Sequence, residues 1–127
     1  MPTFQQPNES ELAWIANNVA RATEMARKYG GLDDVWTSFS GALRASGDDP
    51  NTVINMVGIA IGQQLVDALG LSWVIATDEY GTELAVYREA NNVLVYPCNL
   101  VAKRWQSGET NFIEPIVASM IRDIGAL

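Results

Sequence analysis

Apolar residues recur at spacings of three and four along two stretches near the N-terminus, which predicts two amphipathic helices. The first helix is predicted to begin at Asn8, in the Asn-x-x-Glu pattern of a capping box, and to end at Gly30. The second is shorter, can be capped by Asp33 or Asp34, and stops before Gly47. The chain therefore opens with a pair of helices joined by a tight turn.

A third helix has the clearest start signal in the sequence. Asp49 suits the N-cap position and Pro50 the first helical position, where its missing N–H is not needed. The helix is expected to run to Leu69, with Gly70 closing it. Because it is apolar nearly all round, we expect it to lie at the centre of the domain.

The period of the pattern changes to two after this helix, as in strands. Asp78 to Gly81 has the composition of a type I hairpin turn, and Asn91-Asn92 can supply a second turn because Asn tolerates the left-handed region. The turns separate three β-rich segments, which predicts a three-stranded antiparallel meander. The predicted strands are Leu71–Thr77, Thr82–Arg88 and Val93–Tyr96.

Two more helices are predicted after the meander. Asn99 can cap a short helix that runs to Ser107, and the last amphipathic helix spans Phe112 to Ile124. The order is ααα-βββ-αα, and the fold class is α+β, with the meander packed against the glycine-containing third helix. We expect residues 1–127 to form a single domain, because the length suits one core.

Composition excludes several classes of function. A net charge of −7 works against a phosphate backbone, so no nucleic-acid partner is expected. The chain has no His, which excludes imidazole catalysis and His-ligated zinc, and neither a metal nor a cofactor is predicted. Cys98 is the only cysteine, so no internal disulfide can form and a reducing cytoplasm is expected. Met1–Ser10 does not resemble a signal peptide, and the apolar run Val53–Ile61 is short for a membrane span.

Gly58 and Gly62 lie one turn apart on the third helix and should weaken it by about 1 kcal/mol each relative to Ala. Close packing of another element would compensate for this loss. The alternative is a ligand groove against the bare backbone.

Asp78, Glu79 and Glu83 place three carboxylates around one hairpin. Converging carboxylates could perform acid–base chemistry or bind a cation, whereas carboxylates around a turn are ordinarily solvated. Cys98 has no His to activate it and is interpreted as a half-buried small residue. Lys103 and Arg104 form the only local basic cluster and could hold an anion or simply make an exposed helical face.

Four Trp residues fall on four different predicted elements, which favours a shared aromatic core. Trp14 sits off the main apolar stripe of the first helix. Together with Tyr80 and Tyr87 it could belong to an exposed aromatic patch for a protein partner.

The stretch from Gly58 to Glu109 resembles a family of small bacterial proteins known as domain of unknown function 3806. The resemblance rests on four segments: Gly58–Leu65, Leu69–Val74, Asp78–Glu83 and Tyr96–Glu109. It implies a compact α+β domain and no transferable nucleophile. In the family an acidic residue often follows the second glycine, where this chain has Gln63, so a role for that acid does not carry over.

Three hypotheses about function follow. The leading one is a non-enzymatic, cytoplasmic module that binds or regulates a protein, because the chain is acidic, rich in aromatics and without a catalytic set. The second is a small-ligand binder or enzyme that uses the groove beside Gly58 and Gly62 with the Asp78–Glu83 hairpin. The third is a structural homodimer formed through an edge strand of the meander.

Overall fold

A computed structural model describes residues 1–127 and contains the three helices expected in its N-terminal half. These are α1 (Glu9–Tyr29), α2 (Leu32–Ser46) and α3 (Asn51–Leu69). The capping box at the start of α1 is confirmed. The Glu11 N–H donates to Asn8 Oδ1 and the Asn8 N–H donates to Glu11 Oε1, both at 2.8 Å.

The start of α2 differs from the prediction. Its N-cap position is Gly31, and no side chain caps it. Asp33 and Asp34 lie inside its first turn instead, so the expectation that one of them caps α2 is wrong. At α3 the N-cap position is Pro50, so the prediction of Asp49 at the N-cap and Pro50 at the first helical position is wrong by one residue. Asp49 Oδ1 still accepts a hydrogen bond from the Asn51 N–H, the first of the helix, at 2.9 Å.

The meander is present, but the sheet has four strands. The three predicted strands are β2 (Ser72–Asp78), β3 (Gly81–Arg88) and β4 (Val93–Val95), and β1 (Thr3–Gln5) pairs antiparallel with β2 at the edge. The strand order is β1-β2-β3-β4, which corrects the expected three-stranded sheet and adds a strand before the first helix. A segment of three residues between Pro2 and Pro7 is too short to show an alternating pattern.

Both predicted turns form. Asp78 Oδ1 accepts a hydrogen bond from the Tyr80 N–H at 2.8 Å, which closes the β2–β3 turn. Asn91 and Asn92 have φ values of 64° and 50°, and they lie in a 3₁₀ turn (Ala90–Asn92) that leads into β4. At both positions Asn adopts the left-handed backbone conformation, which it tolerates better than most residues do.

The C-terminal part contains α4 (Pro97–Ser107) and α5 (Ile113–Gly125). Pro97 occupies the first turn of α4, and the N-cap position is Tyr96 with no capping side chain. The prediction that Asn99 caps this helix is therefore wrong, because the N-cap position, Tyr96, lies three residues earlier. Proline suits the first turn, since the N–H it lacks would have no partner there.

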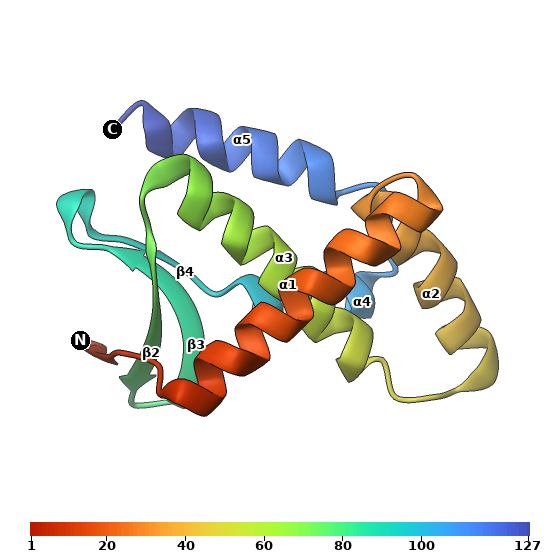
Figure 1. The fold of residues 1–127 in the computed structure, drawn as a ribbon, viewed down its shortest axis with the longest axis horizontal. Coiled ribbons are helices and arrows are strands. Elements are labelled where there is room, and N and C mark those ends of the chain that lie inside the picture. Colours follow the sequence, from red (N-terminus) through yellow and green to blue (C-terminus); the bar gives the residue numbers. More distant parts are fainter.

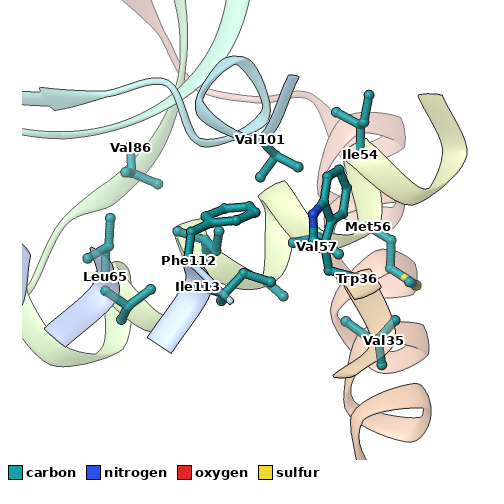
Figure 2. Close-up of a cluster of buried hydrophobic side chains, with 14 of the residues drawn as sticks. Val35, Trp36, Ile54, Met56, Val57, Leu65, Val86, Val101, Phe112 and Ile113 are labelled. Carbon is teal, nitrogen blue, oxygen red and sulfur yellow. The ribbon is translucent and has the colours of Figure 1, made fainter. Parts of the chain in front are cut away.

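The core is built around α3. In Figure 1, α1 crosses α3 on one side and α5 runs above α3. The sheet lies beyond the C-terminal end of α3. Trp36, which is 1% exposed, packs edge-to-face against Phe112 and Trp105, with ring centroids 5.7 and 6.3 Å apart. Figure 2 shows the cluster of side chains that the helices and strands contribute to this core. By length and mean hydropathy (1.3), α3 could span a membrane, but half of that stretch is buried inside the fold.

The two faces of the sheet differ. Trp73 and Val86, which lie opposite each other on β2 and β3, face the helical core. The opposite face carries Phe4 and Tyr87, whose rings stack with centroids 4.1 Å apart. This aromatic pair therefore covers part of the face that is turned away from the core.

Candidate functional site

Gly58 and Gly62 are both buried, and the start of α4 lies directly against them. A Cβ at Gly58 would come within 2.6 Å of Cys98 Cα, and one at Gly62 would overlap the Trp73 ring. The expectation of close packing is therefore confirmed. Cys98 and Trp73 fill the space beside the two glycines, so the alternative hypothesis of a ligand groove there is wrong.

Gln63 links Trp73, which packs against Gly62, to the exposed Asp67. The Trp73 indole N–H donates to Gln63 Oε1 at 3.0 Å, and the Gln63 amide donates to Asp67 Oδ1 at 2.9 Å. An ionised acid at position 63 could accept from Trp73 but could not donate to Asp67. The neutral amide therefore suits its neighbour in this chain.

The β2–β3 hairpin brings together part of the predicted site. Asp78, Tyr80 and Glu83 border one hollow of about 260 Å³, together with Tyr96 and Asn99. Asp78 is already bonded to the turn backbone, and Tyr80 is 89% exposed. These side chains share a hollow but do not form a buried acid–base pair.

Glu83 in this hollow has a raised pKa. Partial burial and the nearby Asp78 charge raise the pKa of Glu83, and Lys103 opposes the shift. The pKa of Tyr96 is raised by partial burial and by Asp78 and Glu83. Partial burial and a neighbouring acid at a hairpin account for the raised pKa of Glu83, so the shift does not by itself indicate a catalytic role.

Trp14 is exposed to 42%, as its position off the apolar stripe suggested. It borders a second hollow, of about 350 Å³, with Ile75 and Leu84, and this hollow also includes Glu83. The hairpin end thus lies between Trp14 and Tyr80. Tyr87 lies apart from both, because it is stacked on Phe4 on the outer face of the sheet.

The remaining candidates, Cys98, Lys103 and Arg104, lie on α4. Burial raises the pKa of the Cys98 thiol to about 12, with a smaller contribution from the Glu83 charge. Arg104 forms an ion pair with Glu109 at 3.2 Å, whereas Lys103 is exposed. Lys103 and Arg104 therefore do not act as one anion site. No group of three acidic or cysteine side chains is placed to hold a metal ion.

A larger hollow than these two lies elsewhere, between α1, α3 and α5. It has a volume of about 660 Å³ and is open to solvent. We call it the three-helix groove. In Figure 1, α1 and α5 approach each other near the α1–α2 turn and diverge above α3, and each packs on α3. The groove is the space between these diverging helices.

Small and apolar side chains line the three-helix groove. Ala22 and Ala26 come from α1, Ala60 from α3, and Val117 and Ala118 from α5. Because alanine side chains are short, the backbones of the three helices lie near the surface of the groove. An incoming helix could therefore approach closely.

Acidic residues surround the three-helix groove, and no Lys or Arg lines it. Asp33 is engaged, because its two carboxylate oxygens accept the N–H groups of Ile113 and Glu114 at 2.8 and 3.0 Å. Asp34, Asp67 and Glu114 are exposed, and none of them forms an ion pair. The groove therefore combines an apolar floor with a negatively charged rim.

The sequence did not indicate this groove, because it arises where two helices distant in the chain diverge. The closest signal was the alanine spacing on α1, in which Ala22 and Ala26 are four residues apart on one helical face. Asp33 was also recognisable from the sequence as a capping residue. The helix that it caps, however, is α5, some eighty residues later in the chain.

Comparison with known families gives one match. The family model described as "Domain of unknown function (DUF3806)" matches residues 42–116, which cover α3, the whole β2–β4 meander and α4. No curated protein and no solved structure shows significant similarity to the chain. The α1 wall of the groove and most of its α5 wall lie outside the matched residues, whereas its α3 floor lies within them.

Proposed function

The chain belongs to the domain of unknown function 3806 family, and we propose that it is a non-enzymatic, cytoplasmic module that binds another protein in the three-helix groove. The observation that supports this most is the groove itself, an open hollow on the surface of a small protein, with a buried apolar floor and an exposed acidic rim. An apolar surface rimmed by polar residues is typical of an interaction site. A helix lying in a groove between helices is a common mode of peptide recognition.

The polar groups near the groove favour a protein over a small molecule. Asp33 is bonded to the α5 backbone, and Asp67 is bonded to Gln63. A small-molecule site usually offers a few convergent polar groups and encloses most of its ligand. This groove is open and wide, and its engaged polar groups suit a partner that covers them.

The two alternatives have less support. An enzyme would need an activated group, but the pKa of Cys98 is about 12 and Asp78 is bonded to its own turn. A homodimer through the sheet would need an open edge strand. β1 covers the edge of β2 and is flanked by Pro2 and Pro7, and the opposite edge strand, β4, has only three residues, so both edges of the sheet are short.

The proposal is tested by substituting a residue inside the groove and a matched residue outside it. Ala118 is exposed on α5 and lines the groove, whereas Ala42 is exposed on α2 and does not. The variants Ala118→Arg and Ala42→Arg carry the same change on exposed helical positions. The tagged full chain and both variants would be used to capture proteins from cells that express the native protein, with quantitative mass spectrometry as the measurement.

We expect a stoichiometric partner to be captured by the native chain and by Ala42→Arg, and to be lost with Ala118→Arg. A partner retained equally by all three chains would move the binding surface away from the groove. Repeated failure to capture any partner would count against a protein-binding function.

A further inference from the structure

The chemistry of the groove also specifies its occupant. Resting on the proposed function, we infer that the three-helix groove takes an amphipathic helix of a partner protein with a stripe of small apolar residues flanked by Lys or Arg.

The shape of the groove supports a helix. Three helices form its floor and sides, and α1 alone, with 21 residues, is about 31 Å long. The short side chains of Ala26 on α1 and Ala118 on α5 are accessible to solvent, so a further helix can approach closely between α1 and α5 above the buried Ala22 and Ala60. An extended strand has no sheet edge to pair with here, because the groove is bounded only by helices and the α1–α2 turn.

The charge of the groove supports a basic partner. Asp34, Asp67 and Glu114 lie on its rim as exposed carboxylates, and no basic side chain lines it. Lys and Arg on the flanks of an incoming helix would contact these carboxylates while the apolar stripe covers the alanines. Charge complementarity of this kind increases the association rate and selects among partners.

A second copy of this chain suits the groove less well. In a two-fold symmetric dimer the same surface meets itself, so Asp34, Asp67 and Glu114 would face their own copies. The chain has 15 acidic and 8 basic residues, so most of its surface repels an acidic rim.

The test uses two synthetic peptides of about 18 residues, or five turns of helix. Both carry the same Leu and Ala stripe on a strongly helical background. One has Lys at the flanking positions and the other has Glu. Fluorescence anisotropy of labelled peptides would give the affinities, and amide chemical-shift changes in the isotope-labelled full chain would locate the binding site.

We expect the Lys peptide to bind at least about tenfold more tightly than the Glu peptide at low salt. The shifts should map to α1, α3 and α5 around the groove. Ala118→Arg should weaken Lys-peptide binding by at least about tenfold, and Ala42→Arg should leave it unchanged.

A pair of charge variants separates local complementarity from the overall charge. Asp34→Asn, Asp67→Asn and Glu114→Gln together neutralise the rim. Asp48→Asn, Glu79→Gln and Glu89→Gln together remove the same charge from exposed positions outside the groove. The rim variant should lose the preference for the Lys peptide, and the control variant should keep it.

Several outcomes would overturn the inference. These are equal binding of the two peptides, absence of binding by both, shifts that map to the Trp14 hollow or the sheet, and a preference that survives the rim variant. Self-association that Ala118→Arg abolishes, measured by sedimentation, would make a second copy the occupant and would also overturn it.

The inference and the proposed function can fail separately. A native partner that depends on the groove but inserts an acidic or extended segment contradicts the inference and leaves the proposed function standing. Specific Lys-peptide binding without any captured partner supports the chemistry of the groove and leaves the proposed function without its main support.

Discussion

Gly58 and Gly62 determine how closely α4 and Trp73 approach the central helix. An added Cβ at Gly58 meets Cys98 backbone atoms at 2.6 and 3.0 Å, so the obstacle is the start of α4 and not a movable side chain. Glycine weakens a helix interior by about 1 kcal/mol relative to Ala. The close contact of α3 with α4 offsets that loss.

Gly58→Ala should therefore destabilise the protein although Ala is the better helix former. We expect a loss of about 1–3 kcal/mol in the free energy of unfolding, since extra volume in a packed core displaces backbone. Gly41→Ala is the matched control, because Gly41 lies within α2 and a Cβ there meets nothing within 4 Å. The control should gain up to about 1 kcal/mol in urea denaturation, and a stabilised Gly58→Ala would contradict the packing argument.

Cys98 should be unreactive in the folded protein. Burial raises the pKa of its thiol from an ordinary 9.0 to about 12, so at pH 8 the thiolate fraction is about a thousandfold smaller. We expect the native chain to react with a disulfide reagent on the order of 10³-fold more slowly than the chain unfolded in urea. The native rate should keep rising with pH well above 9, whereas the unfolded rate levels off there. Fast native labelling at pH 8 would show an accessible thiol.

At the scale of elements, Asp33 ties α5 to α2. Its two carboxylate oxygens accept the Ile113 and Glu114 N–H groups, which are unpaired donors at the start of α5. Asp33 thus works as an N-cap supplied from another helix, and it fixes the closed end of the three-helix groove.

Asp33→Ala should cost about 1–2 kcal/mol in unfolding free energy, as the loss of an N-cap does. The neighbouring Asp34 caps no helix and forms no ion pair, so Asp34→Ala should change stability by less than about 0.5 kcal/mol. Hydrogen exchange should show faster opening of the first turn of α5 in Asp33→Ala than elsewhere in the helix. Equal losses in the two variants would argue against a specific cap.

The sequence was sufficient for elements whose signals are local. The capping box at Asn8, the αL residues Asn91 and Asn92, and the alternation of β3 each depend on neighbours in the chain. Elements fixed by distant contacts were missed. β1 has three residues and exists because β2 offers it a partner, and Asp33 caps a helix that its own neighbourhood does not reveal.

The candidate site follows the same division. The hairpin residues Asp78, Tyr80 and Glu83 were found together, because one turn brings them together. The three-helix groove could not be predicted, since its walls come from α1 and α5 and its width depends on their relative angle. Periodicity shows which face of a helix is buried but not the angle between two helices packed on a third.

At the scale of the whole molecule, the charge is poorly compensated. The chain carries 15 acidic and 8 basic residues, and only three ion pairs form, at distances of 3.2 to 3.7 Å. The pairs Lys28–Glu24 and Arg122–Asp123 are largely exposed and contribute little. Repulsion among the unpaired carboxylates therefore acts against the folded state.

Added salt should stabilise this protein, because screening weakens the repulsion more than it weakens a few exposed pairs. Raising NaCl from about 20 to about 300 mM shortens the screening length severalfold, and we expect a gain of up to about 1 kcal/mol in the free energy of unfolding by urea. The triple variant Asp48→Asn, Glu79→Gln and Glu89→Gln reduces the negative net charge from −7 to −4. Added salt should therefore increase its free energy of unfolding by less. Stability that falls with NaCl would mean that the ion pairs outweigh the repulsion. The acidic rim of the groove would then be part of a balanced surface, and its preference for a basic helix would have to be weaker than its charge suggests.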